Sequence, residues 1–78
     1  MSSEVDREYG RLMEQVRKDR ELSQFELAKL MGTYQTRLSR WEQGLIRISA
    51  PDFANWADKV SLTESEWTTF RALGVIAA

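Results

Sequence analysis

The sequence has 78 residues, of which 42% are hydrophobic and 29% charged, a composition typical of one folded globular domain. It contains neither cysteine nor histidine, which excludes disulfides, thiol nucleophiles, zinc sites built on these residues and the most common general base. No apolar run approaches the roughly 20 residues of a membrane span, and the N-terminus lacks the apolar core of a signal peptide. We therefore expect a cytoplasmic protein without metal, cofactor or membrane contact, and an enzyme is the weakest functional class.

The net charge of −1 conceals an uneven distribution along the chain. Residues 17–47 contain seven basic and four acidic side chains, whereas the segments before and after them each contain two basic and four acidic ones. The middle of the chain is therefore positive and both flanks are negative. Because a phosphate backbone responds to the local charge of a face, the middle segment is the candidate for a nucleic-acid contact.

The first predicted helix starts after Ser2 or Ser3 and runs to about residue 20. A hydroxyl residue followed by acids is a common helix start. Apolar residues then recur at helical spacing, namely Val5, Tyr9, Leu12, Met13 and Val16. Gly10 interrupts this stripe, and we expect it to weaken the helix by about 1 kcal/mol relative to alanine.

A second helix is predicted over about 23–31, ending at Gly32. Ser23 and Glu26 have the spacing of a capping box, in which each side chain bonds the other residue's amide. One apolar stripe at helical spacing follows, made of Phe25, Leu27, Ala28, Leu30 and Met31.

A third helix is predicted over about 35–43, with Leu38 and Trp41 facing inward and Gly44 ending it. Its opposite face is polar and has no acid, and it comprises Gln35, Thr36, Ser39, Arg40 and Gln43. Together with the preceding helix this pattern predicts a helix-turn-helix at about 23–43. The alternative is an ordinary helical hairpin with a solvated outer face.

Two more helices are predicted downstream. Ser49 caps the first of them, and Thr63 with Glu66 forms another capping box for the second, which runs to about Leu73. No segment alternates with the period of a strand. The expected fold is an all-α bundle of five helices forming a single domain over residues 1–78.

Short motifs between residues 12 and 60 keep fixed distances from one another: Leu22-Ser23-Gln24, Glu26-Leu27-Ala28, Gly32, Leu38-Ser39, Glu42 and Gly44, then Ser49, Phe53 and Ala57. This combination resembles the Cro/C1-type (XRE) helix-turn-helix family of phage and bacterial repressors, over roughly two thirds of the chain. The resemblance implies a five-helix bundle of the lambda-repressor-like type, whose recognition helix enters the major groove.

By matching position, the resemblance assigns roles to individual residues. It places the following at base-reading positions: Gln35, Thr36, Ser39 and Arg40. Arg40 is the strongest candidate, because a guanidinium can bond guanine O6 and N7 together. It implies phosphate contacts for Gln24, Arg37, Gln43 and Arg47. We expect a further phosphate contact from Tyr34, which stands where the family has a serine cap. For each of these residues the alternative is a solvated surface side chain.

The resemblance also implies an ion pair between Arg17 and Glu42, since an acid on a DNA-binding helix would repel phosphate unless neutralised. The alternative is two unrelated exposed charges. The chain departs from the family where Thr33 and Tyr34 replace an aliphatic residue and a serine cap. We expect the cap to shift to Thr33, which would rotate the start of the helix. Trp41 replaces a smaller core residue, and we expect it to widen the packing.

These observations lead to two functional hypotheses. The first is a bacterial or phage-encoded transcription regulator, a repressor that binds a palindromic operator as a homodimer. The predicted dimerisation element is residues 63–78, because Val75 and Ile76 form an apolar end; the alternative is that this end folds back onto the first helix. The second hypothesis is an antitoxin or phage accessory protein that mainly binds a protein partner.

Overall fold

The computed structural model describes residues 3–74, and within this range all the regular elements are α-helices. They are α1 (Glu4–Asp19), α2 (Gln24–Met31), α3 (Gln35–Glu42), α4 (Ala50–Val60) and α5 (Glu64–Ala72). The all-α fold of five helices predicted from the sequence is confirmed. None of these helices is long and apolar enough to cross a membrane.

Local capping chemistry starts four of the helices. Reciprocal capping boxes join Ser3 to Asp6, Ser23 to Glu26 and Thr63 to Glu66, and the Ser49 hydroxyl accepts from the Asp52 amide at the start of α4. The side chains therefore satisfy backbone amides that have no partner inside the helix. The helix starts predicted at these serines and at Thr63 are confirmed, with Ser3 rather than Ser2 as the first cap.

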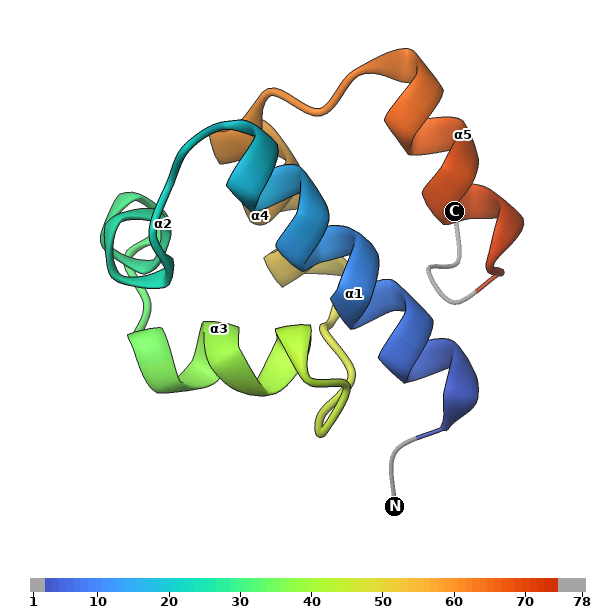
Figure 1. The fold of residues 1–78 in the computed structure, drawn as a ribbon, viewed down its shortest axis with the longest axis horizontal. Helices are drawn as coiled ribbons and strands as arrows, with labels where there is room; N and C mark the ends of the chain where they lie inside the picture. The colour runs from blue at the N-terminus through green and yellow to red at the C-terminus, as the bar shows by residue number, and fades with distance from the viewer. Residues whose placement is uncertain (1–2, 75–78) are drawn as a thin grey trace.

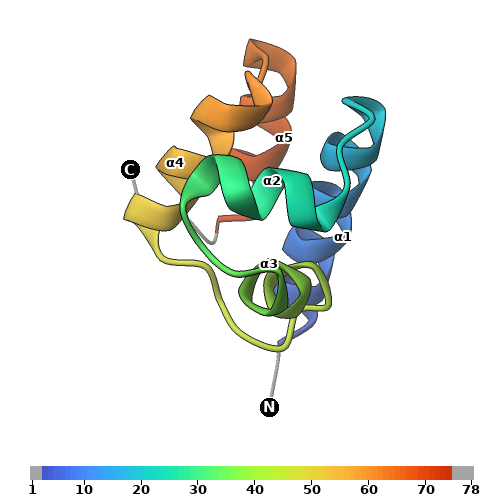
Figure 2. The same ribbon diagram turned by 90° about the vertical axis from the view of Figure 1, so that its left-hand side faces the viewer.

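The helices are arranged around α1, which crosses the centre of the molecule in Figure 1. In this view α3 lies on one side of α1 and α5 on the other (Figure 1). Figure 1 shows α2 end-on and α3 lengthwise, whereas Figure 2 shows α2 lengthwise and α3 end-on. The two helices therefore run in clearly different directions. α3 packs against both α1 and α2, and α2 also packs against α4.

The core combines residues from all five helices and from the loop after α3. Its buried apolar members are Tyr9, Met13, Val16, Leu27, Ala28, Met31, Leu38, Trp41, Ile48, Phe53, Trp56, Ala57, Val60 and Phe70. Within it an aromatic cluster joins α1, α4 and α5: the Phe53 ring lies 5.5 Å from that of Tyr9 and 5.1 Å from that of Phe70. Burial raises the pKa of Tyr9 to about 12.

Some residues of the predicted apolar stripes lie at the surface instead. Phe25 is 62% exposed and Leu30 55% exposed, so α2 buries only Leu27, Ala28 and Met31. The apolar stripe of α2 is therefore only partly buried, because a two-turn helix offers only a narrow side to its neighbours. Val5, near the start of α1, is also 38% exposed.

Gly10 has a structural role that the sequence did not reveal. A Cβ atom placed there would lie 2.4 Å from the backbone oxygens of both Trp41 and Glu42. The absence of a side chain therefore lets α1 approach the last turn of α3 directly. From the sequence we expected Gly10 to weaken α1, whereas the structure shows that it is buried at the contact between the two helices.

Arg20, at the C-terminal end of α1, fixes α5 to the rest of the molecule. Its Nε donates to the Val60 carbonyl oxygen at 2.9 Å, and its NH1 donates to Glu66 Oε2 at 2.7 Å. Glu66 is at the same time the acid of the α5 capping box. The Arg20 guanidinium, with hydrogen bonds from Thr63, lowers the pKa of Glu66 to about 2. One arginine thus joins the ends of α1 and α4 to the start of α5.

Candidate nucleic-acid interface

A left-handed residue ends α2 and makes the turn between α2 and α3. Gly32 has φ of 76°, and the Thr33 amide donates to the Ala28 carbonyl oxygen at 2.9 Å. The side chain of Asn55 in α4 also donates to the Met31 carbonyl oxygen, at 2.9 Å. The turn is therefore closed by its own backbone and supported from α4, which sets the direction in which α3 begins.

α3 begins without a side-chain cap. Its N-cap residue is Tyr34, whose side chain makes no capping hydrogen bond and is 78% exposed. The prediction that the cap shifts to Thr33 was wrong. The helix begins at Gln35, so Gln35 and Thr36 occupy its first turn.

The outer face of α3 presents polar and basic side chains to the surroundings. Gln35, Thr36, Arg37, Arg40 and Gln43 are all exposed, and Ser39 is half-buried. Gln43 Nε2 donates to Ser39 Oγ at 2.7 Å, so these two side chains are linked. The Arg37 guanidinium lies over the Trp41 ring, 5.8 Å from its centre. The structure thus brings all four predicted base-reading residues to one helix, with Ser39 the least accessible.

The single acid of α3, Glu42, is buried and paired. Arg17 Nε donates to Glu42 Oε2 at 2.7 Å, and Arg17 NH2 donates to Oε1 at 3.0 Å. The same guanidinium donates through NH1 to the Leu22 carbonyl oxygen at 2.7 Å. The two side chains are 8% and 2% exposed. The pair links α1 to α3 and leaves the outer face of α3 without a negative side chain.

Gln24, at the first position of α2, belongs to the same polar cluster. Its Nε2 donates to Glu42 Oε1 at 2.9 Å, and the residue is half-buried. This contact holds the start of α2 against the last turn of α3. The phosphate contact that the resemblance implies for Gln24 stays a prediction.

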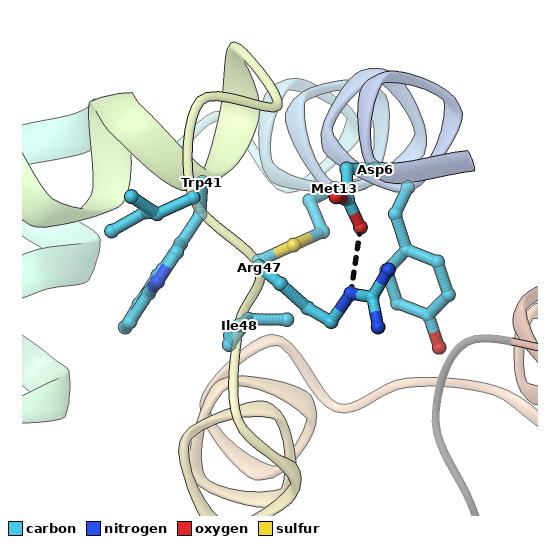
Figure 3. A pocket seen from close by; sticks show the side chains of 7 residues that line it. Asp6, Met13, Trp41, Arg47 and Ile48 are labelled. Carbon is cyan, nitrogen blue, oxygen red and sulfur yellow. Dashed lines mark hydrogen bonds and ion pairs between the residues drawn. The ribbon is translucent and has the colours of Figure 1, made fainter. Parts of the chain in front are cut away.

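Arg47, in the loop between α3 and α4, is bound to α1. Its Nε donates to Asp6 Oδ1 at 2.9 Å, and Figure 3 shows the arginine side chain reaching from the loop to that carboxylate. Trp41, Met13 and Ile48 lie around it in the same view and line a pocket of about 10 Å3, room for one water molecule at most. The Arg47 side chain is 59% exposed, so its predicted phosphate contact would compete with Asp6.

Two open hollows flank the start of α3, and Ile46 is the apolar lining residue that the sequence analysis did not single out. Phe25, Lys29 and Tyr34 lie around one hollow, between α2 and α3. Ile46 lies at the other, together with Tyr34, Thr36, Arg37 and Arg40. The sequence carries no signal that separates Ile46 from its apolar neighbour Leu45, since only the folded loop decides which of the two lines the hollow. Within residues 3–74, no group of acidic side chains is arranged to hold a metal ion.

Comparisons with known proteins agree with this geometry. The family model described as a helix-turn-helix domain matches residues 8–69. The crystal structure of the clp gene regulator ClgR from C. glutamicum superposes with a TM-score of 0.79 at 19% sequence identity, covering 99% of this chain and 97% of that one. At this identity the likeness concerns the fold. No curated protein sequence matches the chain.

Proposed function

The chain belongs to the helix-turn-helix domain family, and we propose that it is a transcriptional repressor that binds a palindromic operator as a homodimer. It would act as a single DNA-binding domain that occupies promoter DNA in the cytoplasm, without catalysis. The observation that supports this most directly is the outer face of α3. Its exposed side chains are neutral or basic, and Glu42, the acid of the helix, is neutralised inside the protein by Arg17. Such a face suits the negative potential of a DNA groove.

The proposed division of labour follows the position of each residue. Arg40 would bond a guanine edge, with Gln35, Thr36 and Ser39 reading neighbouring bases. Phosphates would be contacted around the groove by Gln24, Tyr34, Arg37, Gln43 and Arg47. The role assigned to Arg40 is the best supported of these, because its side chain is exposed and has no ion-pair partner within residues 3–74.

A homodimer would place two copies of α3 about 34 Å apart, in successive major grooves of a palindrome. We propose that residues 63–78 form its interface. In the described part of this segment, Trp67 and Leu73 are half-buried and the Arg71 guanidinium lies 5.4 Å from the centre of the Trp67 ring. Val75 and Ile76, on which the prediction was based, lie outside the described residues.

A second candidate function is binding to a protein partner, as in an antitoxin or a phage accessory protein. The observation that favours it is the exposure of Phe25 and Leu30 on α2, since exposed large apolar residues often mark protein interfaces. A partner that covers Phe25 would lie close to the start of α3, because Phe25 shares a hollow with Tyr34, Gln35 and Thr36.

Selection of bound duplexes from a random library, followed by titration of the enriched site at several salt concentrations, tests the repressor proposal. We expect one palindromic sequence to be enriched and log K to fall steeply with log of the salt concentration, as counterions are released from the phosphates. A chain that enriches no sequence, or whose binding does not depend on salt, would refute the proposal. Sedimentation of the complex at low micromolar concentration would give the number of chains on each site.

A further inference from the structure

Ile46 is a large apolar residue held at the surface next to the base-reading face of α3. It is 41% exposed and lines an open hollow with Tyr34, Thr36, Arg37 and Arg40. The hollow is open to the surroundings, so Ile46 is accessible to a ligand that lies against α3. Two of the hollow's residues, Thr36 and Arg40, are those proposed to meet the edges of bases.

The backbone around Ile46 is fixed, so its exposure is a property of the fold. The Leu45 amide donates to the Arg40 carbonyl oxygen at 3.0 Å, which turns the chain back onto the last turn of α3. Gly44 is buried, and a Cβ atom there would lie 2.6 Å from the Cα atom of Arg7 in α1. On the other side, Arg47 is bound to Asp6 and Ile48 is 5% exposed. The residues on both sides of Ile46 are therefore anchored.

The chemistry of the major groove offers a single apolar group to such a residue. Bases present hydrogen-bond donors and acceptors on this side, and the C5-methyl group of thymine is the exception. We infer that Ile46 reads sequence: it receives the methyl group of a thymine next to the base pair that Arg40 contacts. This inference rests on the proposed function. It adds to that proposal an apolar base-reading residue outside the polar face of α3, and a thymine as the base that this residue contacts.

Replacing thymine by uracil removes this methyl group and keeps base pairing, so it tests the inference directly. Each thymine of the selected operator is replaced in turn by deoxyuridine, and binding is followed by fluorescence anisotropy at fixed salt. We expect one position in each half-site, beside the base pair contacted by Arg40, at which uracil weakens binding about three- to fivefold, the effect of one buried methyl. The Ile46→Ala variant should bind the thymine and uracil sites equally.

Leu45→Ala is the matched control, because Leu45 is 57% exposed on the same loop but does not line the hollow. This variant should keep the preference for thymine. The inference is overturned if no thymine is sensitive in the native chain, if Ile46→Ala keeps the preference, or if both variants lose it. A selection that enriches no sequence at all refutes the proposed function as well. An enriched site that is insensitive to uracil refutes the role of Ile46 alone.

Discussion

Arg17 in α1 and Glu42 in the last turn of α3 are joined by two parallel hydrogen bonds, of 2.7 Å and 3.0 Å, in the interior of the protein. Glu42 also accepts from Gln24 in α2, so the carboxylate is shared by three helices. The positive charge of Arg17 and the negative charge of Glu42 compensate each other in the protein interior, where water does not hydrate them. The same pair fixes the relative position of α2 and α3 and removes the negative charge of α3 from the proposed DNA-binding face.

Replacing Glu42 by alanine would leave the Arg17 guanidinium buried without its counter-ion. We expect Glu42→Ala to lower the free energy of unfolding by about 3–5 kcal/mol, measured by urea denaturation. Glu8→Ala is the control, because Glu8 pairs with Arg11 at an exposed site, where the loss should be at most about 1 kcal/mol. The double variant Arg17→Met/Glu42→Leu should be more stable than Glu42→Ala. Equal losses for Glu42→Ala and Glu8→Ala would contradict this account.

Whether replacing Gly10 by alanine raises or lowers the stability of the protein depends on the tertiary contacts of this residue. Helix propensity alone predicts that Gly10→Ala stabilises the protein by about 1 kcal/mol. The structure predicts the opposite, a loss of about 2 kcal/mol or more, because the new Cβ would meet backbone oxygens of Trp41 and Glu42 that cannot move independently. Thermal unfolding followed by circular dichroism would decide between the two. A melting temperature above that of the native chain would show that α1 does not approach α3 this closely.

The features that could be predicted from the sequence are those determined by neighbouring residues. A capping box such as Ser23 with Glu26 needs only two side chains three positions apart, and its geometry follows once the helix forms. The polar face of α3 was likewise evident from helical spacing. Phe25 and Leu30 show the limit of that reasoning, because periodicity identifies an apolar side of α2 but does not say how much of that side its neighbours cover.

Contacts between distant parts of the chain could not be read from the sequence. Arg20 meets Glu66 across 46 positions, and Asn55 reaches the Met31 carbonyl oxygen across 24. These bonds depend on how the helices are placed in space. The same holds at the candidate site, where only the folded chain shows that Arg47 is bound to Asp6. Which side chains of the site are already hydrogen-bonded within the protein depends on packing, and the sequence does not show it.

The Arg20–Glu66 contact predicts a loss of stability in acid. The pKa of Glu66 is lowered to about 2 in the folded protein, chiefly by its hydrogen bonds to Arg20, against an ordinary value of 4.5. A depressed pKa stabilises the folded state above the unfolded value, so this contribution is complete above about pH 4.5 and is lost as the pH falls towards 2. We expect Glu66→Gln to cost roughly 2 kcal/mol at pH 7 and progressively less below pH 4.5, measured by urea denaturation at each pH.

Glu64→Gln is the matched control for this experiment, because Glu64 is an exposed acid in the same first turn of α5. Its effect on stability should stay small at every pH. A difference between Glu66→Gln and the native chain that remains constant from pH 7 to pH 2 would show that the Glu66 carboxylate does not titrate in this range.

Asp6 should limit the affinity for DNA, because it occupies the Arg47 guanidinium proposed to contact a phosphate. We expect Asp6→Asn to raise the affinity for the selected operator about two- to fivefold at low salt, with a smaller effect at high salt. Glu4→Gln is the control, since it removes one negative charge from the same turn of α1 without freeing Arg47. Equal effects of the two variants in anisotropy titrations would mean that only net charge matters.

Arg40 and Arg37 lie three positions apart on α3 and allow base reading to be separated from phosphate binding. We expect Arg40→Ala to weaken binding to the operator by about 1–3 kcal/mol and to relax the preference at one base pair in each half-site, because a bidentate contact to guanine is lost. Arg37→Ala should instead weaken all duplexes to a similar degree and reduce the slope of log K against log salt by about one per chain. Repeating the library selection and the salt titration with each variant measures both effects. If Arg40→Ala leaves the selected sequence unchanged while lowering the salt slope, Arg40 contacts the backbone, and the base pair must be read by Gln35, Thr36 or Ser39.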